Sequence, residues 1–170
     1  ASSSSTLGRA GPPGAPGRTT CATHLAQALS ESGPTLLVDA DTVAPSCSAH
    51  LGLLDEAPGV LAAARLVDAG TLNLHQLRSI AAHVTPGFDV LTGIGHSGRW
   101  HELTRFHLGR VLDLAAQHYR WVVIDVAAEV EADIRAVVEA AGLVPAGTAI
   151  VRVDEWATGV AASLRAGLEV

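Results

Sequence analysis

The chain has 170 residues, of which 48% are apolar and 16% are charged, a composition typical of one globular domain and not of a disordered chain. The net charge of -6 argues against a nucleic-acid-binding surface, and the few aromatic residues argue against a platform for stacked bases. No apolar run approaches the roughly 20 residues of a membrane span, and two cysteines are too few for a disulfide scaffold, so we expect reduced thiols in the cytoplasm.

The amino-terminal segment differs in composition from the rest of the chain. The first 17 residues are rich in serine, glycine and proline, and we expect residues 1–10 to be disordered or atypical. A single domain is predicted over residues 11–170. A phosphate-binding fold would need a strand before its loop, and residues 1–10 do not have that pattern, so the first strand of such a fold is missing from the sequence pattern.

Hydrophobic periodicity predicts helices and strands in alternation. In chain order we expect a helix at 19–32, a strand at 35–39, helices at 46–53, 59–69 and 74–83, a strand at 88–93, a helix at 100–118, a strand at 120–126, a helix at 130–141, a strand at 148–153 and a helix at 155–168. The strands are short, continuous apolar runs, which is typical of buried parallel strands. This order predicts an α/β layered domain with a mostly parallel sheet flanked by helices.

Residues 11–20, GPPGAPGRTT, have the glycine spacing and paired threonines of a phosphate-binding loop. Such loops hold phosphate with backbone N–H groups at a helix N-terminus, and their usual pattern is G-x-x-x-x-G-K-[ST]. Gly17, Arg18 and Thr19 fill the last three positions, with arginine in place of lysine, while the first glycine position falls on Pro12. Taken alone, the segment is equally consistent with a turn capped by Thr19.

Three acids follow the apolar strands. Asp39 and Asp41 come at the end of the strand at 35–39, and Asp125 comes at the end of the strand at 120–126. Ligands of open α/β sheets bind at the carboxyl ends of the strands. Carboxylates at that edge can hold Mg²⁺ together with the Thr19 hydroxyl. One such acid is more often a helix cap or a loop residue, but the combination with a glycine loop favours a nucleotide site.

Together these stretches resemble the ParA/MinD family of deviant-Walker P-loop ATPases, and within it the CpaE/TadZ-like and actinobacterial chromosome-partitioning branch. The matching segments stand in the family's order over about residues 11–165: GAPGRTT (14–20), LLVDADT (36–42), LGLLDEAPGVLAAARL (51–66), VLTGIGHSGRWHEL (90–103) and WVVIDV (121–126). The resemblance implies a P-loop NTPase-type fold, incomplete at its C-terminal end, that binds ATP and Mg²⁺. It also implies a cytoplasmic switch that forms homodimers and works with protein partners in cell division, partition or pilus assembly.

Position by position, the resemblance implies roles for the loop and the acids. Thr19, Asp39 and Asp125 would serve the metal, with Asp39 acting indirectly, and Asp41 would be the catalytic residue that helps to place the attacking water. The nucleotide-binding loop would comprise Gly14, Ala15, Pro16, Gly17, Arg18, Thr19 and Thr20.

The sequence also departs from the family. Pro13 occupies the position of the lysine that reaches across the dimer, and Arg18 occupies that of the loop lysine. Arginine keeps the charge but presents a larger, planar group. Since phosphoryl transfer depends on positioning, we expect ATP binding with weak hydrolysis. The alternative is a catalytically dead scaffold or localisation module, and a Rossmann-like dinucleotide enzyme ranks last because GAPGRT has the wrong glycine spacing.

Overall fold

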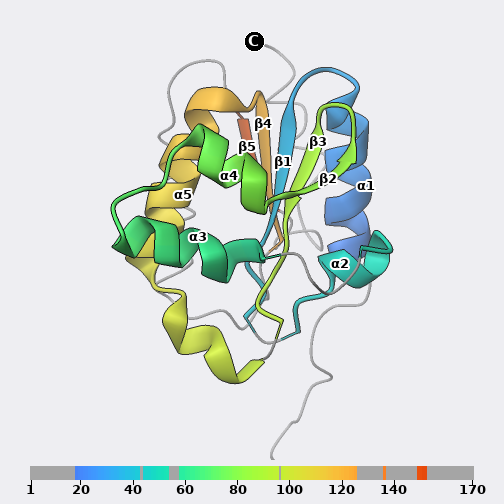
Figure 1. Cartoon of the computed structure of the whole chain (residues 1–170). Coiled ribbons are helices and arrows are strands. Elements are labelled where there is room, and N and C mark those ends of the chain that lie inside the picture. The colour runs from blue at the N-terminus through green and yellow to red at the C-terminus, as the bar shows by residue number, and fades with distance from the viewer. Residues whose placement is uncertain are drawn as a thin grey trace, which may run out of the picture.

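The computed structural model describes residues 18–42, 44–53, 58–95, 97–125, 136 and 149–152. A five-stranded sheet in the order β2-β3-β1-β4-β5 forms the centre of this part of the chain (Figure 1). Its strands are β1 (Thr35–Asp39), β2 (Ala82–Thr85), β3 (Phe88–Leu91), β4 (Trp121–Asp125) and β5 (Ala149–Arg152). Four strands are parallel, and β2 pairs antiparallel with β3 at one edge. The predicted α/β fold with a mostly parallel sheet is confirmed.

Helices cover both faces of the sheet (Figure 1). One face carries α1 (Arg18–Ser30) and the short α2 (Cys47–His50), and the other carries α3 (Gly59–Asp68), α4 (Leu74–Ile80) and α5 (Arg105–His118). A 3-10 helix, η1 (Ser97–Glu102), precedes α5. No helix in the described part of the chain is long and apolar enough to span a bilayer.

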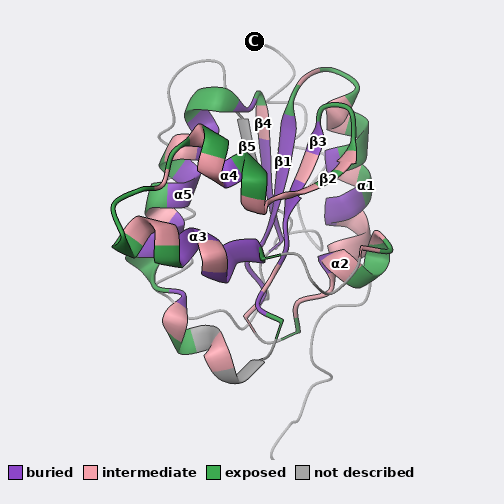
Figure 2. Ribbon diagram, in the orientation of Figure 1, coloured by how far each residue is buried: buried purple, intermediate pink, exposed green. Residues whose placement is uncertain are grey.

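The period of two along the strands divides the core into two clusters. In β1, Leu36 and Val38 pack in the cluster formed with α3, α4 and α5, while Leu37 packs in the cluster formed with α1 and Cys47. All five residues of β1 are buried, and Figure 2 shows this strand in purple. Burial on both faces is why these runs read as continuously apolar.

The predicted helix at 74–83 is wrong over its last three residues. Helix α4 ends at Ile80, and Ala81 is extended, with φ -80° and ψ 143°. The chain then enters β2, which pairs with β3 across a tight turn in which Gly87 has φ +83°. Residues 82–85 alternate between half-buried and exposed, as an antiparallel edge strand does. The short segment satisfied a helical pattern, but hairpin pairing with β3 decided its structure.

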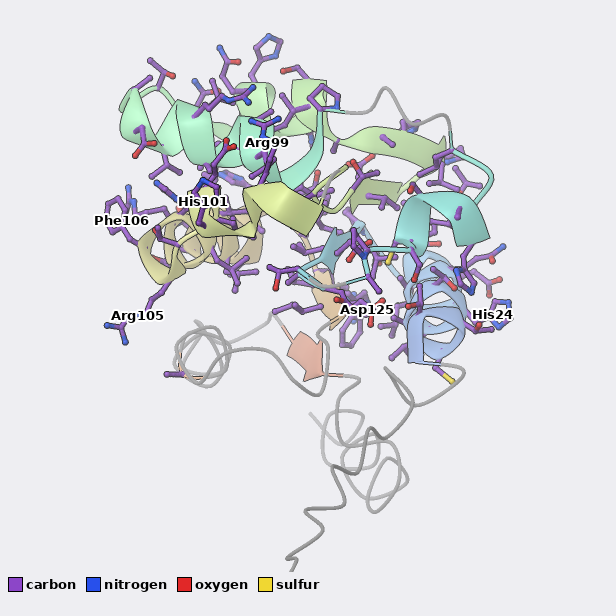
Figure 3. All side chains as sticks on the ribbon, turned by 90° about the horizontal axis from the view of Figure 1, so that it is seen from below. His24, Arg99, His101, Arg105, Phe106 and Asp125 are labelled. Atoms are coloured by element: carbon purple, nitrogen blue, oxygen red, sulfur yellow. The ribbon has the colours of Figure 1, made fainter. Side chains whose placement is uncertain are left out.

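The predicted helix at 100–118 is two helices. Helix α5 begins after Thr104, whose side chain accepts a hydrogen bond from the His107 N–H while the His107 ring accepts one from the Thr104 N–H. This capping box separates α5 from η1. Phe106, in the first turn of α5, is an apolar residue, yet it is 63% exposed and points away from the sheet (Figure 3).

One other predicted helix is shorter than expected, and several predicted segments lie outside the described residues. The helix expected at 46–53 contracts to the four residues of α2. The segment 1–17, the helix at 155–168 and all but one residue of that at 130–141 lie outside the described residues.

Candidate functional site

Two aspartates meet at the carboxyl edge of the sheet. The register of β1 and β4 pairs Asp39 directly with Asp125. Leu37 and Val123, which lie two positions before Asp39 and Asp125, pack on the α1 side of the sheet. Side chains two positions apart on a strand point to the same face, so both carboxylates also point to the α1 side. Asp39 is 1% exposed and Asp125 is 2% exposed. Figure 3 looks onto this edge and shows Asp125 beside α1.

The Asp39 carboxylate is held by backbone N–H groups. Oδ1 accepts a hydrogen bond from Asp41 N at 3.2 Å, and Oδ2 accepts bonds from Ser46 N at 3.1 Å and Cys47 N at 3.0 Å. Burial raises the pKa of Asp39 to about 7, the negative charge of Asp125 adds to this rise, and the backbone hydrogen bonds oppose it. The Asp39 side chain therefore has a fixed orientation and a high proton affinity.

Cys47 completes a buried cluster with the two aspartates. Its thiol donates to Asp125 Oδ2 at 3.5 Å. One ligand atom from each of Asp39, Cys47 and Asp125 lies within 4.8 Å of the others. Burial, followed by the two carboxylates, raises the pKa of the Cys47 thiol far above its ordinary value, so the free thiol stays protonated. Both Cys21 and Cys47 are free cysteines in this structure.

A hydroxyl pair ties α1 to this cluster. Thr19 Oγ1 lies 3.0 Å from Ser46 Oγ, and the Ser46 N–H donates to Asp39. Thr23 Oγ1 donates back to the carbonyls of Thr19 and Thr20, at 2.9 and 3.0 Å, within the first turns of the helix. The start of α1 therefore lies against the loop that holds Asp39.

Gly93 forms one wall of the site. A Cβ at this position would lie 2.4 Å from Pro45 Cβ and 3.0 Å from Asp39 Cγ. The loop after β3 thus approaches the Asp39 carboxylate so closely that only glycine fits without displacement. The sequence shows a glycine after this strand, but nothing local shows what it faces.

Three solved structures share this arrangement of strands and helices. The ParA family ATPase from Chlorobium tepidum TLS matches with a TM-score of 0.67 and 19% identity over 75% of this chain and 53% of that chain. This chain therefore shares its fold with a ParA family ATPase. The septum site-determining protein MinD from Pyrococcus horikoshii OT3, complexed with Mg-ADP, matches with a TM-score of 0.51 and 24% identity over 66% and 45% of the two chains. Apo McdA from Cyanthece matches with a TM-score of 0.52 and 20% identity over 67% and 46%.

The chain spans about half the length of these structures, between 45% and 53%. No family model matches the sequence, and no curated protein matches it. The three structural matches confirm the ParA/MinD-like fold expected from the resemblance. The CpaE/TadZ-like branch and the deviant Walker loop stay predictions.

The predicted site residues fall into two groups. The structure brings Thr19, Asp39 and Asp125 to one place, linked through Ser46 and the register of the sheet. Asp41 lies next to them and is 8% exposed, with Oδ1 accepting from Ala44 N at 2.8 Å.

The rest of the predicted loop is described only in part. Gly14, Ala15, Pro16 and Gly17 lie outside the described residues, as does the side chain of Arg18, the first residue of α1. Thr20 is half-buried in the first turn of α1.

Sequence reasoning missed Ser46 and Cys47. Both lie a few residues after Asp39 and Asp41, in a segment of small residues. A small polar segment directly after a strand-end acid was the available signal, because such a loop can turn its N–H groups back onto that acid.

Proposed function

We propose that this chain is a ParA/MinD-like ATP-binding switch with weak ATP hydrolysis, which works in the cytoplasm with protein partners, and as a homodimer, to position or partition cellular cargo. The observation that supports it best is the link from Thr19 at the start of α1, through Ser46, to Asp39 at the carboxyl end of β1. It joins a helix N-terminus, where phosphate binds well, to an acidic strand end. The Mg-ADP in the P. horikoshii MinD structure, which shares the fold, is consistent with this ligand.

The oxygen donors of the site suit Mg²⁺. The Asp125 and Asp39 carboxylates and the Thr19 hydroxyl are hard ligands of the kind that Mg²⁺ binds. In the proposed function, Mg²⁺ would neutralise phosphate charge, Thr19 and Asp125 would hold it, and Asp39 would support it indirectly. Asp41 would orient the attacking water, and residues 14–20 would hold the phosphates.

The scaffold alternative is favoured by the Cys47 thiol. Its hydrogen bond to Asp125 occupies an oxygen that Mg²⁺ would need, and the sulfur itself is a poor ligand for Mg²⁺. A site closed in this way can keep the fold without turnover.

Titration with labelled ATP and Mg²⁺ tests the nucleotide proposal. We expect saturable binding that Arg18→Ala and Thr19→Ala each weaken by about tenfold or more, since each removes a phosphate or metal contact. Thr71→Ala is the matched control, because Thr71 is an exposed threonine in the α3–α4 loop and its loss should change nothing. Absence of ATP binding would refute the nucleotide proposal.

Hydrolysis separates the two functions. A slow phosphate release that disappears in Asp41→Ala supports the switch. Nucleotide binding with no release, in both the parent chain and Asp41→Ala, supports the scaffold.

A further inference from the structure

We propose that Asp39, Cys47 and Asp125 form a binding site for a thiophilic divalent cation of the Zn²⁺ or Co²⁺ type, which binds without nucleotide. This thiol–carboxylate cluster uses a residue, Cys47, that the proposed ATP site does not need. The proposal goes beyond the ATP function, and the two can fail separately.

The three ligands converge from different parts of the fold. Asp39 ends β1, Asp125 ends β4, and Cys47 begins α2. All three residues are at most 2% exposed, and their ligand atoms lie within 4.8 Å of one another. The cluster is therefore buried and built from three separate elements, unlike an acidic surface patch.

One distance already matches zinc geometry. Zinc bonds of about 2.3 Å to sulfur and about 2.0 Å to oxygen, at a tetrahedral angle, place those two atoms about 3.5 Å apart. Cys47 Sγ lies 3.5 Å from Asp125 Oδ2. The other two ligand-atom distances in the cluster are at most 4.8 Å.

Asp125 supplies an independent indication of a cation. Its carboxylate is buried, yet in the described part of the chain its one hydrogen-bond donor is the Cys47 thiol, and a thiol is a weak donor. Asp39, by contrast, accepts three bonds from backbone N–H groups. A buried carboxylate with so little compensation, directed at a second carboxylate, is stabilised by a positive ion between them.

The donor set selects the type of cation. Sulfur is a poor ligand for Mg²⁺, whereas one thiolate with two carboxylates suits Zn²⁺ and Co²⁺. When the metal–sulfur bond forms, the Cys47 S–H bond breaks and its proton leaves to solvent, as happens for coordinating thiols. The backbone bonds to Asp39 would then orient a metal ligand.

Cobalt titration of the full 170-residue chain, reduced and free of nucleotide, tests the site. We expect one equivalent of Co²⁺ to produce a near-ultraviolet thiolate-to-cobalt absorption band and intense visible bands of tetrahedral Co²⁺. One equivalent of Zn²⁺ should remove these bands, and a large excess of Mg²⁺ should leave them.

Variants identify the ligands. Cys47→Ser should abolish the thiolate band and weaken Zn²⁺ binding by more than about 100-fold, since even partners outside the ligand set cost 10–100-fold. Cys21→Ser is the matched control and should keep the band, because Cys21 is outside the cluster. Asp125→Asn should weaken binding while circular dichroism shows a folded protein.

Three outcomes overturn the proposal: no thiolate band in the parent chain, a band that survives in Cys47→Ser, or displacement of Co²⁺ by Mg²⁺. Because no nucleotide is present, failure of ATP binding leaves a positive cobalt result standing. ATP binding with no cobalt band refutes this site alone.

Discussion

Asp39 and Asp125 lie opposite each other on adjacent parallel strands, and the Cys47 thiol donates to the second of them. Two buried carboxylates at one strand edge repel each other, so the free protein stores electrostatic strain there. That strain is the property that a bound cation, a proton or the start of α1 can relieve. We therefore expect pH and ligands to act on this edge of the sheet.

The pKa of Asp39 makes stability depend on pH. The unfolded chain releases this proton near the ordinary pKa of 3.8, and the folded protein holds it up to about 7. Because the folded state binds more protons between these values, the contribution of Asp39 to the free energy of unfolding falls as pH rises from about 4 to about 7 and is level above that range. Asp39→Asn should remove this decline, which is on the order of 4 kcal/mol.

Urea unfolding in chelator across this pH range measures the effect. Asp113→Asn, which changes an exposed acid on α5, is the control and should keep the profile of the parent chain. Parallel profiles for Asp39→Asn and the parent chain would show that Asp39 does not hold the proton.

Gly93 should not tolerate a side chain. In Gly93→Ala the new Cβ would meet Pro45 at 2.4 Å and the Asp39 carboxylate carbon at 3.0 Å. We expect a loss of about 1–3 kcal/mol in the free energy of unfolding, as for overpacked cores. Gly95→Ala is the control, because its Cβ would meet nothing within 4 Å. Equal stability of the two variants in chemical denaturation would contradict the close approach.

The single tyrosine provides a spectroscopic test of the α5–β4 junction. Tyr119 is buried, and its hydroxyl donates to Asp89 Oδ2 at 2.7 Å. Burial, and then this hydrogen bond, raise the pKa of Tyr119 above its ordinary value of 10.0. At pH 10 the folded chain should therefore show far less tyrosinate absorbance than the chain in guanidinium. Asp89→Asn should lower the pKa in part, and equal absorbance of folded and unfolded chains would contradict the burial.

Helix α5 depends on its N-cap. Thr104→Ala removes the side-chain acceptor for His107 N and should lower the free energy of unfolding by about 1 kcal/mol. Thr104→Ser keeps the hydroxyl and should stay within a few tenths of the parent chain in the same denaturation assay. If serine costs as much as alanine, the cap is not what separates η1 from α5.

Local patterns predicted most of the layered fold. The apolar runs at 35–39, 88–91 and 121–125 contain enough information for buried parallel strands, because burial on both faces requires continuous hydrophobicity. The same period of two predicts which strand positions share a face. The hairpin formed by β2 and β3 was not predicted, because the four residues of β2 are of mixed polarity and fit a helix or an edge strand equally well. Only pairing with β3 decides between the two.

By itself, the sequence determined that acids end two buried strands and that a helix begins within a residue of Thr19, since these properties depend on residues a few positions apart. Only the tertiary structure decided that Asp39 lies opposite Asp125, that Cys47 lies beside both aspartates and that Gly93 packs closely against Asp39. Asp39 and Asp125 lie more than 80 residues apart in the sequence, and the register of parallel strands is set by packing of both helical layers, which no local pattern contains.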